Sequence, residues 1–302
     1  MGQPALLACD WGTTNLRAWT LDADGAVVAE REFSLGVSTL VPGEVGRRFE
    51  QEVRPALGAA GLPAILCGMV GSNLGWALAP YANCPAGFAD LARAAIQVAP
   101  HATPPVRIVP GLRCAGLTGA PDVMRGEETQ VLGWLAQHPD RQQGRHLICH
   151  PGTHAKWVVV VNGRIVRFVT AMTGEMFAVL SKHSVLKSDA PANDDDAFEA
   201  GLAAAGDGNA LLARLFSARS RVAGGDARAE STPSYVSGLL IGSEVASLPS
   251  LLDSGSTTVN LLGDAALCSR YRHALEKRSI KSETFDGKSA AIAGLLALHR
   301  MG

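Results

Sequence analysis

Two segments of the chain follow the same plan of three strands joined by two short turns, and this repetition limits the fold more than any other feature. In the first segment, apolar or alternating runs predict strands at Ala5–Cys9, Leu16–Leu21 and Val27–Phe33, separated by the polar stretches Asp10–Asn15 and Asp22–Gly25. Asp, Asn, Gly and Thr are common where a chain reverses direction between strands. The chain is therefore expected to open as two consecutive hairpins.

The second segment lies in the middle of the chain. Strands are predicted at Arg145–Cys149, Trp157–Val161 and Arg164–Thr170, with a polar turn at His150–Lys156 and a tight turn at Asn162-Gly163. The order of strands and turns is the same as in the first segment.

Only the residue pairs Gly12-Thr13 and Gly152-Thr153, which are 140 positions apart, coincide between the two segments. The repeat is therefore one of architecture rather than of sequence. A length of 302 residues also suits two domains. We expect an α/β protein of two related halves, with an N-terminal domain over residues 1–140 and a C-terminal domain over residues 141–302.

Further elements are expected between and after these segments, from the periodicity of apolar residues. They are helices at Glu44–Leu57, Met124–Gln137, Tyr235–Ala246 and Ser289–His299, strands at Ala64–Met69, Val106–Val109 and Val259–Leu262, a loop at Gly111–Asp122 and an exposed loop over 217–233. The acidic cluster Asn193–Asp196 marks a further helix start, where negative charge suits the helix dipole.

Composition excludes several classes of protein. Hydrophobic residues make up 47% of the chain, charged residues 18%, and the formal net charge is −1. This balance argues against a nucleic-acid binder, a polybasic membrane-surface protein and a disordered chain. The sequence has no run of about 20 apolar residues, as a membrane span needs. No signal peptide is expected either, because the first residues contain no basic segment and no small-residue cleavage site. We expect a soluble cytoplasmic protein with no nucleic-acid or membrane partner.

The six cysteines are widely scattered and form no Cys-x-x-Cys pair, and several lie inside apolar runs. Buried reduced thiols are expected rather than disulfides or metal ligands. They are Cys9, Cys67, Cys84, Cys114, Cys149 and Cys268.

The turn Asp10–Asn15 has the composition of a phosphate-binding loop. Backbone N–H groups and threonine hydroxyls donate to phosphate oxygens, and a carboxylate at a strand end can hold Mg²⁺ through water. An ordinary hairpin uses the same residue types. The string alone leaves both interpretations open.

The second turn, Gly152–Lys156, adds a cation to a similar set. Lys156 is the first lysine of the chain, in which arginine outnumbers lysine 21 to 6. Two such turns facing one another could clamp a polyphosphate. The alternatives are a packed or turn-bonded role for His154 and a solvated strand position for Lys156. The chain has no Walker A, dinucleotide-binding, Gly-x-Ser-x-Gly or zinc-ligand pattern.

Six short strings, in order and nearly end to end, resemble the 2-dehydro-3-deoxygalactonokinase family, within the superfamily of actin, sugar kinases and Hsp70. They are Asp10–Arg17, Cys67–Ser72, Pro110–Arg113, Asp122–Glu128, Pro151–Trp157 and Thr173–Glu175.

This resemblance implies two ribonuclease H-like domains with ATP and Mg²⁺ in an interdomain cleft. The implied reaction is ATP-dependent phosphorylation of the terminal C6 hydroxyl of 2-dehydro-3-deoxy-D-galactonate, in D-galactonate catabolism. The alternatives are a superfamily kinase for another small sugar or sugar acid, and a nucleotide-dependent switch ATPase. The sequence does not distinguish the galactonate-derived acid from its gluconate epimer. A homodimer is compatible with the sequence.

The resemblance also assigns the contacts to ATP and its metal. Asp10 is expected to bind Mg²⁺ and to act in catalysis. The expected nucleotide-binding residues form the two phosphate loops and an adenosine motif, in which Asp264 departs from the usual Gly-Gly pair. They are Gly12, Thr13, Thr14, Asn15, Gly152, Thr153, His154, Lys156, Gly263 and Asp264.

Asp122 occupies the place where many superfamily kinases carry the catalytic aspartate. A carboxylate there can accept the proton of the attacking hydroxyl. A helix N-cap is the structural alternative for Asp122. Glu127 and Glu128 are the competing candidates for the base, unless they belong to a solvated helix face.

The substrate carboxylate calls for an arginine, whose planar guanidinium offers two parallel donors. Ser72 and Asn73 suit the sugar-acid hydroxyls, and Thr173 and Glu175 suit either the substrate or the Mg²⁺ shell. The full set of expected substrate-binding residues is Arg17, Ser72, Asn73, Arg113, Arg125, Glu127, Thr173 and Glu175.

Overall fold

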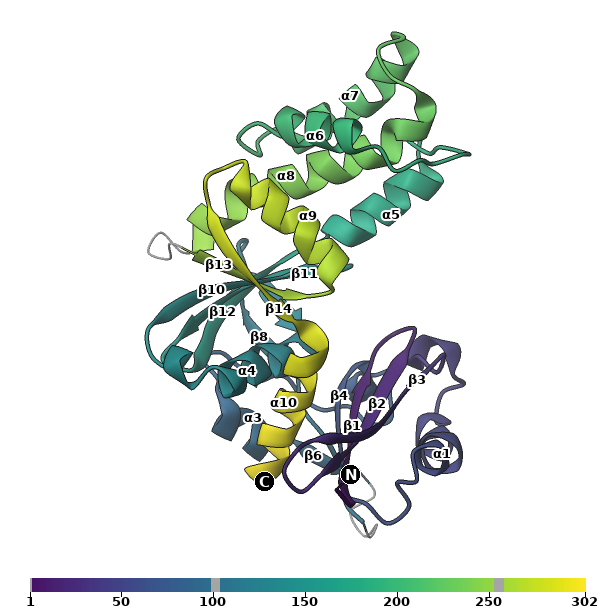
Figure 1. Ribbon diagram of the computed structural model, residues 1–302, viewed down its shortest axis with the longest axis vertical. Helices are drawn as coiled ribbons and strands as arrows, with labels where there is room; N and C mark the ends of the chain where they lie inside the picture. The colour runs from purple at the N-terminus through teal and green to yellow at the C-terminus, as the bar shows by residue number, and fades with distance from the viewer. Residues whose placement is uncertain (1, 99–103, 253–257) are drawn as a thin grey trace. The chain divides into compact units, whose positions relative to one another are not determined.

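The computed structural model describes residues 2–98, 104–252 and 258–302, and the chain divides into two compact units (Figure 1). The first unit comprises Met1–Gly144, Val160–Arg167 and Gly287–Gly302, and the second comprises Arg145–Val159 and Phe168–Asp286. The C-terminal segment thus packs with the N-terminal part of the chain rather than with the half that precedes it.

A six-stranded mixed sheet forms the centre of the first unit. β1, β2 and β3 are antiparallel neighbours, β4 and β7 add parallel to β1, and β6 closes the sheet antiparallel to β7. In spatial order the strands are β3 (Val27–Phe33), β2 (Leu16–Asp22), β1 (Pro4–Trp11), β4 (Ala64–Gly68), β7 (Val106–Ile108) and β6 (Ile96–Val98). The predicted opening hairpins are confirmed.

One face of this sheet is covered by the helical segment expected at Glu44–Leu57. The segment consists of α1 (Val45–Arg48), a π-helical turn (Phe49–Val53) and α2 (Arg54–Ala56). Phe49 and Val53 are fully buried with Trp11 of β1, and the Phe49 and Trp11 rings lie 6.3 Å apart. This packing holds the end of β1, from which the first polar turn leaves.

Helices α4 (Glu127–Gln137) and α10 (Gly287–Arg300) pack against each other at very short range in the first unit. A Cβ atom at Gly133 would lie 1.7 Å from the carbonyl oxygen of Ala290, and one at Gly294 would lie 2.1 Å from that of Thr129. The two glycines therefore allow the backbones to touch. The shorter α3 (Phe88–Ala94) also contacts α10.

A small three-stranded sheet takes up both ends of the loop expected at Gly111–Asp122, and residues 116–120 between its strands remain a loop. Its order is β5 (Ala82–Asn83), β8 (Leu112–Ala115) and β9 (Pro121–Met124). These strands are too short and too mixed in polarity to give an alternating pattern, which is why the loop prediction was wrong at both ends.

The second sheet has the order β12-β11-β10-β13-β14, with β13 and β14 parallel to β10. This order matches β3-β2-β1-β4-β7 in the first unit, so the predicted duplication of an α/β architecture is confirmed. The Asn162-Gly163 turn has positive φ at both residues, 48° and 73°, as predicted for a tight hairpin. The strands are β10 (Arg145–His150), β11 (Ala155–Val161), β12 (Arg164–Ala171), β13 (Thr258–Gly263) and β14 (Lys281–Asp286).

Five helices accompany this sheet in the described part of the second unit. They are α5 (Thr173–His183), α6 (Asp195–Ala204), α7 (Leu211–Ala223), α8 (Thr232–Leu252) and α9 (Ala265–Glu276). The helix start expected at the acidic cluster is confirmed, since the Asp194 carboxylate accepts the Ala197 N–H at 2.9 Å. The exposed loop expected over 217–233 is wrong, because α7 runs into that stretch and α8 begins inside it.

Helix α8 corrects the expectation about membrane-length segments. It is long and apolar enough to cross a membrane by length and composition, but it is mostly buried in the second unit. Its glycines pack against α6: a Cβ atom at Gly238 would lie 2.1 Å from the Phe198 carbonyl oxygen. We therefore describe α8 as a core helix.

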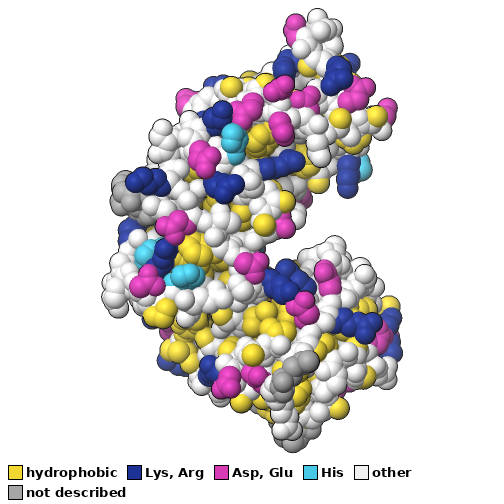
Figure 2. Space-filling view, viewed as in Figure 1, with side chains coloured by type: hydrophobic (Ala, Val, Ile, Leu, Met, Phe, Trp, Pro, Cys, Tyr) yellow, Lys and Arg dark blue, Asp and Glu magenta, His cyan; other side chains and the backbone are white. Residues whose placement is uncertain are grey.

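All six cysteines are free, as predicted, and Cys9, Cys67, Cys149 and Cys268 are buried. Cys84 and Cys114 are only half-buried, so the expectation of burial was wrong for these two. Figure 2 shows acidic and basic side chains interspersed on the face in view of each unit, in keeping with the formal net charge of −1.

Candidate active site

The first polar turn leaves the end of β1 and has a firmly held backbone. The Gly12 N–H donates to the Asn15 carbonyl oxygen at 2.9 Å, and the carbonyl oxygens of Gly12, Thr13 and Thr14 accept hydrogen bonds from the backbone N–H groups of residues 36–38. The side chains of Thr13, Thr14 and Asn15 are exposed. A fixed backbone with accessible hydroxyl groups can donate to phosphate oxygens without further ordering.

Asp10 lies just before this turn and faces Arg17 across the β1–β2 pair. The two form an ion pair of 3.2 Å, and Asp10 is only 8% exposed. Burial raises the pKa of the Asp10 carboxyl, the Arg17 charge opposes that rise, and the negative charge of Glu127 adds to it. Asp10 is therefore a buried carboxylate whose charge is only partly compensated.

Two further carboxylates lie at the start of α4, close to the end of β4. Glu127 Oε2 accepts the Arg125 N–H at 3.0 Å, and Glu128 Oε2 accepts the Gly126 N–H at 2.7 Å. Gly126 has a φ of 112°, and a Cβ atom there would lie 3.3 Å from the Gly68 Cα. The close approach of these two backbones brings the start of α4 to the strand that neighbours Asp10.

The two glutamates differ in exposure. Glu128 is fully buried, and burial together with the Glu127 charge raises its pKa to about 8. Glu127 is only half-buried. Of the two, Glu127 has the side chain that a ligand can reach, and the interpretation of both as a solvated helix face is wrong.

Asp122 lies on β9, paired with Cys114 of β8. Helix α4 has Gly126 as its N-cap, so the N-cap interpretation of Asp122 is wrong. The side chain of Asp122 is half-buried. Its expected role as the base stays a prediction, and Glu127 is the carboxylate whose charge acts on Asp10.

The residues expected to bind the substrate occupy different environments in the first unit. Ser72 is buried and accepts the Leu74 N–H through its hydroxyl oxygen, whereas Asn73 is exposed. Arg113 is exposed on β8, and Arg125 is buried just before α4.

The second polar turn lies between β10 and β11, and the start of α5 packs directly on it. A Cβ atom at Gly174 would lie 2.5 Å from the Gly152 carbonyl oxygen, and the Glu175 N–H donates to the Thr153 carbonyl oxygen at 2.9 Å. The His154 ring and the Glu175 carboxylate are hydrogen-bonded through Nε2 and Oε2. The structure thus brings together two of the strings that resemble the kinase family, Pro151–Trp157 and Thr173–Glu175, which are about 20 residues apart. The hairpin between them returns the chain to the turn.

Lys156 is buried rather than solvated, with 4% of its surface exposed. Its ammonium group donates to the His154 carbonyl oxygen at 3.3 Å. The alternative of a solvated strand lysine is therefore wrong. The charge lies directly behind the second turn, where it can favour an anion bound to the exposed backbone.

Glu244 of α8 is the residue in this region that sequence analysis missed. Its carboxylate accepts three hydrogen bonds, from Trp157 Nε1 at 2.5 Å, from the Tyr271 hydroxyl at 2.8 Å and from the Thr173 hydroxyl. Burial raises its pKa, and the three donors oppose that rise. One signal was available: Glu244 is the single charged residue within α8.

A pocket of about 430 Å³ opens beside the second turn. Gly152, Thr153 and Thr173 belong to its lining, together with side chains of α5, α8 and α9, among them the polar Ser237, Arg270 and Tyr271. Asp264 belongs to the wall and caps α9 by accepting the Leu267 N–H at 3.0 Å. The expected adenosine motif therefore borders the same pocket as the second phosphate turn.

The apolar part of this pocket consists of Phe177, Leu240, Ile241 and Leu267. A mostly apolar cavity with a few polar groups at one end is typical of small-molecule and cofactor sites. The backbone and hydroxyl groups of the second turn and the apolar walls together suit a molecule with a phosphate tail and a flat ring.

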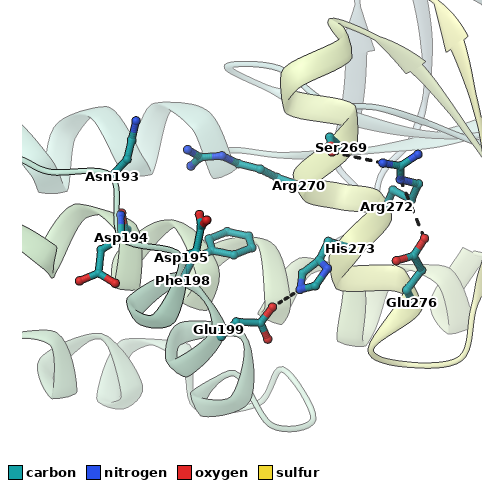
Figure 3. A pocket seen from close by; sticks show the side chains of 11 residues that line it. Asn193, Asp194, Asp195, Phe198, Glu199, Ser269, Arg270, Arg272, His273 and Glu276 are labelled. Carbon is teal, nitrogen blue, oxygen red and sulfur yellow. Dashed lines mark hydrogen bonds and ion pairs between the residues drawn. The ribbon is translucent and has the colours of Figure 1, made fainter.

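A larger neighbouring pocket, of about 600 Å³, lies between α6 and α9 (Figure 3). Arg270 lines both pockets, and its guanidinium donates to the Ser237 hydroxyl at 3.1 Å. In Figure 3, Arg270 extends from α9 toward the start of α6, while Glu199 of α6 and His273 of α9 pair between the two helices. The larger pocket is lined by side chains of both charges, among them Asp195, Glu199, Arg270 and Arg272.

Comparison with curated proteins finds relatives that match almost the whole chain. A curated Rhizobium meliloti (strain 1021) protein named as a probable 2-dehydro-3-deoxygalactonokinase is 40% identical over 307 residues, covering 97% of this chain and 96% of the relative. The Escherichia coli (strain K12) 2-dehydro-3-deoxygalactonokinase is 35% identical over 294 residues, with the same coverage of 97% and 96%.

Solved structures agree with this. A Sinorhizobium meliloti protein named for the same kinase activity superimposes with a TM-score of 0.84 at 37% identity, covering 98% of both chains. The activator of the 2-hydroxyisocaproyl-CoA dehydratase from Clostridium difficile, solved with bound ADPNP, superimposes with a TM-score of 0.52 at 14% identity, covering 99% of this chain and 96% of the activator. This second match confirms the predicted actin-like ATPase fold.

Residues 10–298 match the 2-keto-3-deoxy-galactonokinase family. With a match over nearly the whole chain and relatives of the same name at 35% and 40% identity, the chain belongs to the 2-keto-3-deoxy-galactonokinase family.

Proposed function

We propose that this protein transfers the γ-phosphoryl group of ATP to the C6 hydroxyl of 2-dehydro-3-deoxy-D-galactonate, giving the 6-phosphate and ADP in D-galactonate catabolism. The observation that carries the proposal is the full-length similarity to the Escherichia coli kinase of that name. The carboxylates around the first turn and the pocket beside the second turn supply the chemistry that such a transfer needs.

The nucleotide is proposed to bind in the pocket of the second unit. Backbone N–H groups of Gly152 and Thr153 would donate to phosphate oxygens, with the buried Lys156 charge behind them. Leu240 and Ile241 offer an apolar wall to the adenine ring. In the first unit, the exposed Thr13 and Thr14 hydroxyls are proposed to donate to the transferred phosphoryl group.

Mg²⁺ is the expected partner of the nucleotide, and the donor set fits it. Among the described residues no cluster of three or more His, Cys, Asp or Glu side chains is arranged around a metal site. Mg²⁺ bound with ATP usually needs only one or two carboxylates, because phosphates and waters complete its shell. The buried, partly compensated Asp10 carboxylate would hold it. When bound, the ion neutralises charge on the phosphate oxygens.

Glu127 is proposed as the general base, in place of the expected Asp122. It is half-buried, it lies at the start of α4, and its charge acts on Asp10. Glu128 is fully buried, and its two carboxylate oxygens already accept hydrogen bonds from the Gly126 N–H and the Thr129 hydroxyl. As the bond from the C6 oxygen to phosphorus forms, the hydroxyl proton passes to the Glu127 carboxylate and ADP leaves.

The test is the reaction itself. ATP and 2-dehydro-3-deoxygalactonate are incubated with the protein, ADP formation is followed in a coupled assay, and the product is identified by mass spectrometry and phosphorus NMR. A 6-phosphate formed only with the acid present supports the proposal. Equal ADP formation with and without the acid contradicts it and points to the switch ATPase. The gluconate-derived epimer, run in parallel, measures the selectivity for the configuration at one carbon.

A further inference from the structure

Arg125 is a buried guanidinium with unused hydrogen-bond donors. It is 8% exposed, and its Nη2 donates to the Ala79 carbonyl oxygen at 2.9 Å. Its Nε and Nη1 are buried and have no hydrogen-bond partner among the residues that the structure describes. Arginine stays protonated, and a buried charge with unpaired donors is strongly destabilising. The position therefore calls for an anion.

The guanidinium lies in a fitted environment. The Tyr81 ring stacks on it, with the Arg125 Cζ 4.3 Å from the ring centroid. A Cβ atom at residue 71 would lie 2.8 Å from Nη1, so Gly71 leaves room for the guanidinium. Ser72, the next residue, is also buried. The glycine-rich exit of β4 and the segment before α4 thus surround one cationic group.

Arg125 retains a two-donor edge for a ligand. A guanidinium carries five N–H donors, and the Ala79 carbonyl oxygen uses one of the two on Nη2. One N–H of Nη2 lies on the edge shared with Nη1, and the other lies on the edge shared with Nε. Whichever of them the carbonyl oxygen uses, the other remains available together with an N–H of the neighbouring nitrogen. A carboxylate accepts two parallel hydrogen bonds from such an edge, which is the strongest pairing between these groups.

The other two candidate arginines are less suitable. Arg17 is committed to Asp10 in an ion pair of 3.2 Å. Arg113 is exposed, where water weakens its attraction for a carboxylate. Arg125 is also joined to the proposed base, since its backbone N–H donates to Glu127. The carboxylate and the C6 hydroxyl are opposite ends of the six-carbon acid, so the Arg125 guanidinium and Glu127 would contact different ends of it.

We propose that Arg125 binds the carboxylate of the sugar-acid substrate and so selects acids over neutral sugars. The Tyr81 ring, which is 37% exposed, turns aside to admit the carboxylate. This inference rests on the proposed kinase activity and adds to it the residue that recognises the acid group.

The test compares the acid with its uncharged amide as substrates. In the wild-type protein the acid is expected to be the far better substrate. In Arg125→Gln, the KM for the acid rises about 100-fold, the preference for acid over amide disappears, and the KM for ATP is unchanged. Arg125→Lys keeps the charge without the two-donor edge and shows an intermediate loss. Arg93→Gln, at an exposed arginine of α3 that belongs to none of the proposed sites, is the matched control and leaves all of these constants unchanged.

Thermal unfolding and calorimetric binding of the acid separate recognition from folding. If Arg125→Gln unfolds, Arg125→Lys carries the comparison. Retention of the acid preference in the folded variants overturns the inference while leaving the kinase activity intact. Absence of any phosphorylation by the wild-type protein overturns the proposed function itself, and calorimetric binding of the acid then still tests Arg125.

Discussion

The indole N–H of Trp157 donates to the Glu244 carboxylate at 2.5 Å, across 87 residues of sequence. Trp157 follows Lys156 on β11, so this bond ties the strand behind the second polar turn to α8. The Thr173 and Tyr271 hydroxyls complete the set of donors. Since an ionised carboxylate only accepts hydrogen bonds, both hydroxyls direct their hydrogens at Glu244 and offer only lone pairs elsewhere.

Glu244→Gln is expected to weaken nucleotide binding while the protein stays folded. The amide N–H₂ of the introduced glutamine cannot face the Trp157 N–H, because two donors would then meet. It therefore takes the position of the oxygen that Thr173 and Tyr271 contact, and these two hydroxyls must accept a hydrogen bond instead of donating one. Because Thr173 lines the nucleotide pocket, the KM for ATP should rise about tenfold, with the KM for the sugar acid unchanged.

The matched control for this change is Ser243→Ala. Ser243 precedes Glu244 on α8, is buried, and has a hydroxyl without a hydrogen-bond partner among the described residues. Its loss should leave the KM for ATP unchanged. An equal rise in KM for both variants would mean that α8 responds to any alteration of its packing, and that Glu244 has no special role.

The elements that could be predicted from the sequence are those determined by interactions between neighbouring residues. The Asp22–Gly25 and Asn162-Gly163 turns fix their hairpins through the hydrogen bonds and φ angles of neighbouring residues, so these strands appeared where predicted. Glu244 was missed because its donors lie up to 87 residues away in sequence. The burial of Arg125 could not be predicted either, because arginine is abundant in the sequence and the residues around Arg125 come from separate turns.

Stability should fall with rising pH because of Glu128. Its ordinary pKa of 4.5 is raised to about 8 in the folded protein, so between these values the folded state holds a proton that the unfolded state has lost. The stabilising contribution is complete below pH 4.5 and is lost as pH rises through about 8. One proton corresponds to a slope of about 1.4 kcal/mol per pH unit.

Urea unfolding of the wild-type protein and Glu128→Gln at several pH values measures this slope. The variant should be less dependent on pH than the wild type and the more stable of the two above pH 8. Glu276→Gln, at an exposed carboxylate of α9, serves as the control and should keep the wild-type slope. Parallel curves for wild type and Glu128→Gln would show that Glu128 titrates normally.

Glu127→Gln should abolish most of the phosphoryl transfer. Loss of a general base costs about 100- to 10,000-fold in kcat, and Gln keeps the size of the side chain without accepting the proton. Asp122→Asn, on β9, should lower kcat far less. Single-turnover rates with saturating ATP and acid distinguish the two. A large loss in Asp122→Asn beside a small one in Glu127→Gln would return the base to Asp122.

Gly174→Ala should disorder the second polar turn. The added Cβ would lie 2.5 Å from the Gly152 carbonyl oxygen and 2.7 Å from the Thr153 Cα, both of them backbone atoms that cannot turn aside. The start of α5 must then move off the turn, which should lower the Tm by several degrees, since about 1 kcal/mol shifts the Tm of a domain by roughly 2–4 °C.

Gly152→Ala changes the other glycine of the contact between α5 and the turn, and it serves as the control. A Cβ atom at Gly152 meets nothing within 4 Å, so its Tm should equal that of the wild type. Calorimetric titration of a non-hydrolysable ATP analogue then reports on function: Gly174→Ala should bind it more weakly, because the backbone N–H groups of the turn no longer converge on the phosphates. Wild-type Tm and affinity in Gly174→Ala would mean that α5 can shift without disturbing the turn, and that the turn is held by β10 and β11 alone.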